Sequence, residues 1–274
     1  MRIGVCSWSL QASSPADLAA KVRACGLQHV QLALRPIREG AWDLEATRAA
    51  LSGAGITILS GMMEPKGEDY STLDTIRVTG GVRPTVHWQA NVAIAKADAL
   101  LAKRLGLTLV TTHAGFMPVD SGDPEHAVMQ HRLRTLVDIF AAEGVMLAFE
   151  TGQEPAPKML EMLRGLDRKN TGVNFDPANM ILYGTTEPVW SVELLAPWVR
   201  QGHVKDALPC RAPGTWGTEV PAGEGAVMWQ NYLATLRRLG LDIDLVIERE
   251  AGTSRVEDVK KAKAMLALHG MHHG

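Results

Sequence analysis

The chain has 274 residues, of which 46% are hydrophobic and 21% charged, and its formal net charge at pH 7 is −2. Those proportions are typical of globular proteins and exclude an intrinsically disordered chain. The near-neutral charge provides no basic surface for a phosphate backbone, so it argues against nucleic acid as the main partner.

Eight short runs of apolar and β-branched residues recur along the chain and predict β-strands. In chain order they are residues 3–5, 30–34, 56–59, 107–111, 145–149, 173–175, 199–204 and 245–247. The segments between them carry apolar residues at helical spacing and are predicted to be helices that cover the strands. The first helix is expected to begin at Pro15, with Ser14 as its N-cap.

A glycine separates a predicted helix from the next strand at five places, where it is expected to end the helix in the left-handed conformation. These are Gly26, Gly55, Gly106, Gly144 and Gly240. Strict alternation of strands and helices, without a linker, predicts parallel strands with crossover helices. The expected fold is one domain over residues 1–274, a single (β/α)8 TIM barrel, and an open doubly wound sheet remains the alternative.

Metal-type ligands end four consecutive predicted strands: Glu150, Asp176, His203 and Glu248. Each alone could be a helix cap or a solvated loop acid. In a closed barrel, however, the carboxyl ends of the strands meet at one rim, where bare carboxylates repel each other unless a cation or protons intervene. One divalent metal is therefore predicted, with Mn²⁺, Mg²⁺ or Co²⁺ favoured by the oxygen-rich set and Zn²⁺ as the alternative.

The segments around these residues resemble the xylose-isomerase-like superfamily of sugar phosphate isomerases and epimerases. The resemblance rests on residues 149–154, 174–179, 202–206 and 246–250 and covers essentially the whole chain. It implies that Glu150, Asp176, His203 and Glu248 bind the metal. Strand parity alone does not separate Glu248 from Glu250. The family's last-strand ligand matches Glu248, which leaves Glu250 as an outer-shell or loop acid.

In the epimerase branch of this superfamily two glutamates flank the substrate, and they match Glu150 and Glu248. The resemblance thus implies that these two carboxylates transfer the proton of an enediolate mechanism. The chain departs from that branch at Asn179, where the epimerases carry a histidine, and no arginine follows His203 at the branch's spacing.

Further residues are candidates for substrate binding, each with a structural alternative. His113 could bind a hydroxyl or satisfy a loop carbonyl, and Lys205 could bind an oxyanion or pair with Asp206 or Glu224. Trp8 could face a sugar or lie in the core. Arg211, in a glycine-rich loop, could clamp an anion, or the glycines could only let a long surface loop turn. Asn179 is the fifth candidate for substrate binding.

The predicted function is a metal-dependent isomerase or epimerase of a sugar or sugar phosphate. The alternative is a metal-dependent lyase or hydrolase of an oxidised (keto) sugar or glycoside, because both reactions begin by removing a proton next to a carbonyl. An abasic-site endonuclease would need a basic face for DNA, and the near-neutral charge of the chain argues against that function. Cys6, Cys25 and Cys210 lie far apart, which favours a reduced, cytoplasmic location, and no run is apolar enough to span a membrane. The sequence leaves open whether the chain forms a homo-oligomer.

Overall fold

Eight parallel strands close into a barrel in the computed structural model, which describes residues 1–118, 120, 122–212 and 214–271. Around the barrel the strand order is β1-β10-β7-β6-β5-β4-β3-β2. The bounds are β1 Ile3–Cys6, β2 His29–Ala33, β3 Thr57–Met62, β4 Leu109–Thr112, β5 Met146–Glu150, β6 Thr171–Phe175, β7 Val199–Val204 and β10 Asp244–Ile247. The predicted (β/α)8 TIM barrel is confirmed, and the open-sheet alternative is wrong.

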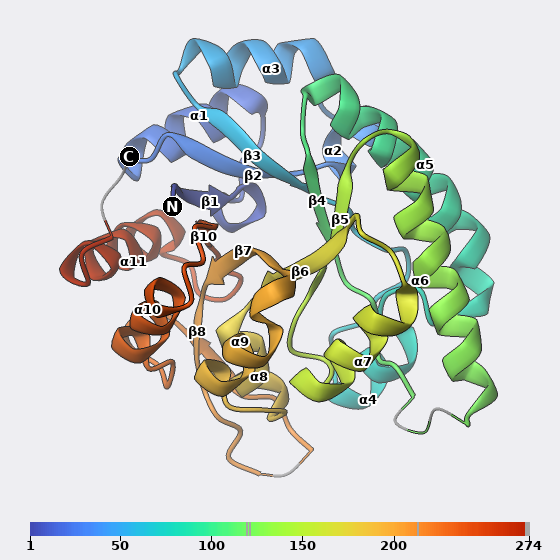
Figure 1. Ribbon diagram of the computed structural model, residues 1–274. Helices are drawn as coiled ribbons and strands as arrows, with labels where there is room; N and C mark the ends of the chain where they lie inside the picture. Colours follow the sequence, from blue (N-terminus) through green and yellow to red (C-terminus); the bar gives the residue numbers. More distant parts are fainter. Residues whose placement is uncertain (119, 121, 213, 272–274) are drawn as a thin grey trace.

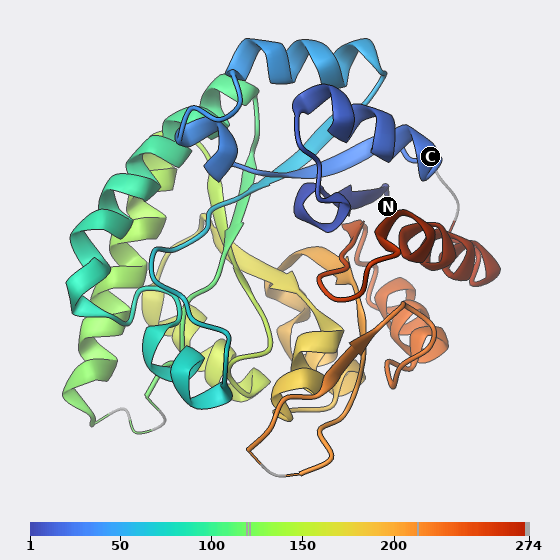
Figure 2. The same cartoon turned by 180° about the vertical axis from the view of Figure 1, so that it is seen from behind.

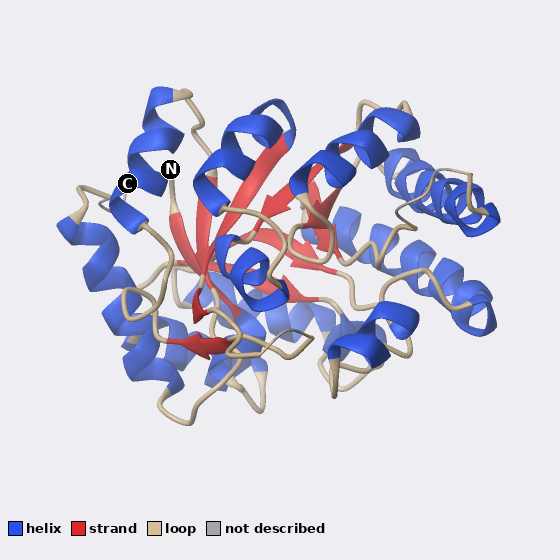
Figure 3. Ribbon diagram, turned by 90° about the horizontal axis from the view of Figure 1, so that it is seen from below, coloured by secondary structure: helices blue, strands red, loops and turns tan. Residues whose placement is uncertain are grey.

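Helices surround the barrel strands, which gather in the middle of the molecule (Figures 1 and 3). The α-helices are α1 Pro15–Ala24, α2 Arg35–Arg38, α3 Leu44–Gly53, α4 Leu73–Thr79, α5 Trp88–Leu105, α6 Pro124–Ala142, α7 Ala156–Leu166, α8 Pro177–Tyr183, α9 Pro188–Leu195, α10 Trp229–Arg238 and α11 Arg255–Leu268. The two longest, α5 and α6, pack side by side (Figure 2). No helix within the described ranges is both long and apolar enough to cross a membrane.

The predicted helix ends are confirmed. Ser14 caps α1 by accepting a hydrogen bond from the backbone N–H of Asp17, and Pro15 is the first helical residue. The five glycines predicted to end helices all have a left-handed φ, between 66° and 74°. Because a side chain is strained in that conformation, glycine at these points lets the chain turn from each helix into the next strand.

Polar residues inside the barrel explain why one strand is longer than the apolar pattern predicts. β3 continues past the predicted end at residue 59 through Ser60 to Met62. Ser60 is fully buried and donates a hydrogen bond to the Oε1 of Gln201 on β7, at 2.6 Å. A hydrogen-bonded polar pair in the interior therefore replaces the apolar residues that the pattern rule expects.

A short antiparallel pair, β8 Asp206–Leu208 and β9 Thr218–Val220, follows β7 and lies outside the barrel (Figure 3). The sequence indicated only a glycine-rich loop here. The buried carboxylate of Asp206 anchors the pair, since it accepts hydrogen bonds from the backbone N–H groups of Gly223 and Val227 and from the Trp229 indole. The pair thereby holds the loop after β7 over the carboxyl-terminal face of the barrel.

Candidate metal centre

The four predicted ligands meet at the carboxyl-terminal ends of neighbouring strands. Glu150 is the last residue of β5, Asp176 directly follows β6, His203 lies in β7 and Glu248 directly follows β10. One ligand atom from each lies within 4.8 Å of the others. All four side chains are buried, at 5% exposure or less.

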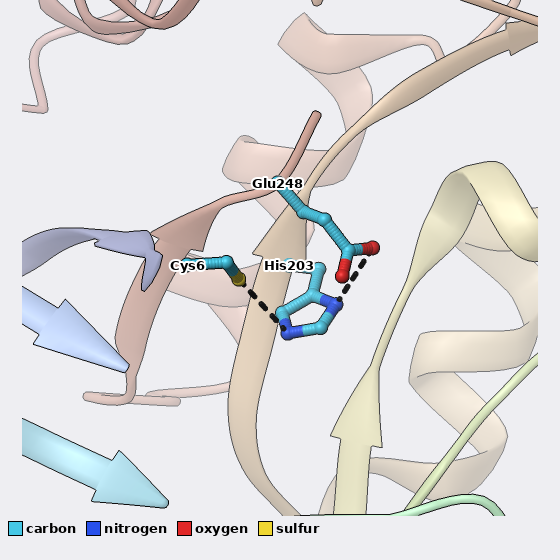
Figure 4. A group of neighbouring side chains, drawn as sticks. All are labelled: Cys6, His203 and Glu248. Atoms are coloured by element: carbon cyan, nitrogen blue, oxygen red, sulfur yellow. Dashed lines mark hydrogen bonds and ion pairs between the residues drawn. The ribbon is translucent and has the colours of Figure 1, made fainter. Parts of the chain in front are cut away.

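The imidazole of His203 stands at the centre of this group. Its Nδ1 lies 3.3 Å from the Oε2 of Glu248, 3.5 Å from the Oδ2 of Asp176 and 3.7 Å from the Oε2 of Glu150. Figure 4 shows the same ring with Nδ1 facing Glu248 and Nε2 facing the thiol of Cys6. All three carboxylates thus converge on a single ring nitrogen.

The electrostatics of the group follow from this crowding. Burial lowers the pKa of His203, but the carboxylates of Glu248 and Glu150 outweigh it and hold that pKa well above its ordinary value. Burial raises the pKa of Asp176. Burial also acts to raise the pKa of Glu248, yet Lys205 and the His203 imidazolium bring it well below its usual range. The carboxylates therefore need a positive charge beside them, from a proton or a metal ion.

Two atoms test whether these residues suit a metal. Asp176 Oδ2 and His203 Nδ1 are buried and have no hydrogen-bond partner among the described residues, although they lie 3.5 Å apart. Buried polar atoms without partners are costly and uncommon in native proteins. Three carboxylates and one imidazole form a donor set typical of Mn²⁺, Mg²⁺ or Co²⁺ sites. The residues present fit a divalent cation.

Local structure explains how Asp176 can serve the fold and the centre together. Its Oδ1 caps α8 by accepting hydrogen bonds from the backbone N–H groups of Ala178 and Asn179, at 2.8 and 3.1 Å. Pro177 occupies the first position of the helix, where a missing N–H costs nothing. The capping interaction leaves Oδ2 directed at His203.

Two buried amides orient the histidine, and sequence reasoning missed both. The Nε2 of His203 lies 2.9 Å from the Oε1 of Gln31 on β2 and 3.0 Å from the Nδ2 of Asn174 on β6. In the neutral form of the ring that can bind a metal, Nε2–H donates to Gln31, and the lone pair of Nδ1 then faces the same point as the carboxylates. The available signal was one polar residue within each buried strand, Gln31 between Val30 and Leu32, and Asn174 between Val173 and Phe175.

Lys205 joins the group from the residue after β7. Its Nζ donates to Glu248 Oε2 at 2.9 Å, to Glu250 Oε2 at 2.5 Å and to Asn179 Oδ1 at 3.2 Å. Burial lowers its pKa, but Glu248, Glu250 and Asp176 raise it well above the ordinary value. It remains a cation between the two glutamates.

The structural alternative considered for Lys205, a pair with Asp206 or Glu224, is wrong. Asp206 instead anchors the β8–β9 pair, and Glu224 pairs with Lys261 on the surface.

Asn179 and His113 both reach Glu150. The Nδ2 of Asn179 donates to Glu150 Oε1 at 2.8 Å, and the Nε2 of His113 lies 3.8 Å from the same oxygen. The other ring nitrogen of His113 contacts the Oε2 of Glu68 at 3.2 Å and the hydroxyl of Tyr70 at 2.8 Å. These side-chain partners replace the loop carbonyl that was the structural alternative for His113. Glu68 and Tyr70 were not predicted as site residues.

The last two candidates lie in very different places. Trp8 follows β1, and its indole N–H donates to Glu248 Oε1 at 2.8 Å, while its ring lies in an edge-to-face arrangement with that of His203. Arg211 is exposed and does not line the cavity at this face, so the structure does not bring it to the group. The loop of Arg211 contributes Trp216 and Gly217 to the cavity instead.

The cavity above the centre has a volume of about 800 Å³. Trp8, His113, Asn179 and Lys205 line it, together with Glu150 and Glu248. It therefore joins the candidate substrate-binding residues to the exposed edge of the candidate metal ligands, and it lies where reactive groups gather in TIM barrels.

Comparison with known proteins agrees with this architecture. A family model described as "Xylose isomerase-like TIM barrel" matches residues 19–269. The crystal structure of a xylose isomerase domain protein from Planctomyces limnophilus is 30% identical, with a TM-score of 0.85, and the match covers 98% of this chain and 95% of that one.

Two more distant structures share the fold. A D-tagatose 3-epimerase-like protein is 17% identical with a TM-score of 0.75, covering 98% of this chain and 97% of its own. A xylose isomerase-like TIM-barrel protein from Mycobacterium smegmatis, in complex with magnesium, is 19% identical with a TM-score of 0.69, covering 93% and 87%. No curated protein matches the sequence significantly. The chain belongs to the xylose isomerase-like TIM-barrel family.

Proposed function

We propose that this protein is a divalent-metal-dependent sugar isomerase or epimerase that holds its metal on Glu150, Asp176, His203 and Glu248. The observation that carries the proposal is a pair of buried atoms, Asp176 Oδ2 and His203 Nδ1, that face each other between two glutamates and have no hydrogen-bond partner among the described residues. Mn²⁺, Mg²⁺ or Co²⁺ suits this set, with Zn²⁺ as the alternative.

The metal, when bound, would act as a Lewis acid on a carbonyl and its neighbouring hydroxyl and so acidify the C–H between them. The protein's own residues prepare two carboxylates for the proton transfer. Glu248 is held by Trp8 and Lys205, and its low pKa keeps it ionised as a base. Glu150 is held by Asn179.

One of these carboxylates would remove the proton to give an enediolate of the sugar, and a proton would then be returned. Return by the same carboxylate to the neighbouring carbon gives an isomer, and return by the other carboxylate on the opposite face gives an epimer. Lys205 lines the same cavity and would supply a fixed cation for the oxygen on which negative charge develops.

The test is solvent-deuterium exchange in the metal-loaded protein, read by NMR across free ketoses, sugar phosphates and keto-glycosides. Glu150→Gln and Glu248→Gln should each lower exchange by about 10²–10⁴-fold, the usual contribution of a general base. Glu161→Gln is the control, because Glu161 is an exposed glutamate on α7 that pairs with Lys158 and does not line the cavity. Full exchange in both site variants would refute the assignment. Release of an aglycone from a keto-glycoside would instead identify the lyase or hydrolase reaction.

A further inference from the structure

The cavity extends well beyond the metal centre and is strongly acidic. Its volume of about 800 Å³ lies high in the range of roughly 300–1,000 Å³ that holds drug-sized ligands, which are larger than a free ketose. Among its described lining residues, acids outnumber permanent cations. The acids are Glu64, Glu68, Glu150, Glu219, Glu248 and Glu250, and the cations are Arg35 and Lys205.

Both cations are already engaged. Arg35 pairs with Glu39 and with Glu64 at 3.1 and 2.8 Å, and Lys205 pairs with Glu248 and Glu250. A phosphate group in the cavity would therefore meet several carboxylates and no uncommitted lysine or arginine among the described lining residues. This arrangement favours an uncharged substrate over a phosphorylated one.

An aromatic wall stands beside the centre, separate from Trp8. Tyr183 closes α8 four residues after Asn179, so the two side chains share one face of the helix about 6 Å apart. Asn179 itself donates to Glu150. The ring of Trp216 packs against that of Tyr183, with centroids 4.8 Å apart, and both rings line the cavity.

The backbone around Trp216 holds its ring in place. The N–H of Gly217 donates to the carbonyl of Leu182 at 3.1 Å, which ties the loop to α8. A Cβ at Gly217 would lie 2.6 Å from the carbonyl oxygen of Leu208, so only glycine allows this close approach. The ring of Phe116 also packs against that of Tyr183, edge to face, with centroids 5.7 Å apart. The wall is therefore a fixed part of the cavity.

We propose that Tyr183 and Trp216 form a second binding subsite that takes a second ring, joined to the reacting keto sugar, so that the substrate is an uncharged glycoside that retains the carbonyl needed by the proposed reaction. This inference depends on the proposed function only to say which of the two rings reacts. Flat aromatic side chains bind the apolar face of a sugar or an aryl ring by burial and stacking. The Tyr183–Trp216 subsite thus predicts a preference for a two-ring ligand over a single sugar or a sugar phosphate.

Calorimetric binding to the full chain tests this preference, with phenyl glucoside, methyl glucoside and glucose 6-phosphate as probes. Phenyl glucoside should bind about tenfold more tightly than methyl glucoside, both with Mn²⁺ and in EDTA. Glucose 6-phosphate in EDTA should bind no better than methyl glucoside. Trp216→Ala and Tyr183→Leu should each remove the preference, whereas Trp190→Ala, an exposed tryptophan on α9, should retain it.

Equal affinity for the two glucosides in the unmodified protein would overturn the subsite, and so would a preference that survives both subsite variants. The comparison in the unmodified protein needs no variant, so an unfolded variant leaves the test decisive. A tenfold preference without any proton exchange would refute the proposed function and leave the subsite standing. Exchange on free ketoses without the preference would refute the subsite alone.

Discussion

Gln31 provides the sharpest test of how the metal centre is organised, because it touches the histidine and none of the carboxylates. It is fully buried on β2, and its Oε1 lies 2.9 Å from His203 Nε2. Gln31→Met keeps the length of the side chain but removes this acceptor. The Nδ2 of Asn174, 3.0 Å from the same nitrogen, would then donate to it and drive the proton to Nδ1. That proton would occupy the atom predicted to bind the metal.

Loss of such an outer-shell partner weakens metal binding by about 10–100-fold, or about 1.4–2.7 kcal/mol. Titration calorimetry with Mn²⁺ measures the change directly. Gln31→Met also removes the hydrogen bonds of Gln31 to Thr111 and Cys6, so Ser60→Ala is the control for loss of buried hydrogen bonding inside the barrel: it removes the bond to Gln201 without touching His203. Unchanged Mn²⁺ affinity in a folded Gln31→Met protein would refute the orientation argument.

Three further predictions concern stability. Burial raises the pKa of Glu154 to about 7 from 4.5, so the folded state retains a proton that the unfolded state releases, and stability falls as pH rises through this window. Glu154→Gln should therefore gain about 3 kcal/mol on the unmodified protein between pH 4.5 and 8, measured by urea unfolding. Asp176→Asn keeps the α8 cap, so in EDTA its stability to thermal unfolding should match that of the unmodified protein. Mn²⁺ at 100 times its Kd should stabilise the unmodified protein by about 2.7 kcal/mol, and the variant should lack this gain. Gly217→Ala should cost about 1–3 kcal/mol through the clash with Leu208, and an unchanged urea midpoint would contradict it.

Local signals predicted the fold well where one residue decides the backbone. Gly26 and Gly240 end helices because their φ is positive, and Ser14 caps α1 through its own hydroxyl. The predicted bounds of β7 match the structure although its pattern is weak. β3 was cut short because Ser60 is buried against Gln201, a partner 141 residues away that no local window contains.

The site residues also divide into those that the local sequence predicts and those that depend on distant contacts. Glu150 and Glu248 stand at strand ends, and strand order alone brings them together in a closed barrel. Gln31 was missed because it reaches His203 from β2, across the barrel interior. Trp216 was missed because its position depends on the β8–β9 pair, which the glycine-rich sequence did not indicate.

A network of buried polar side chains inside the barrel links the fold to the candidate metal centre. Gln201 Nε2 donates to Asn174 Oδ1, and Asn174 Nδ2 in turn reaches Glu150 Oε2 and His203 Nε2. A buried polar network is stabilising only when its members are satisfied. His203 Nδ1, at the end of this network, and the neighbouring Asp176 Oδ2 are two of the buried atoms that lack a hydrogen-bond partner among the described residues. A cation between them would satisfy both at once, so the same ion that the proposed chemistry needs would also complete the hydrogen-bonded core that carries the site.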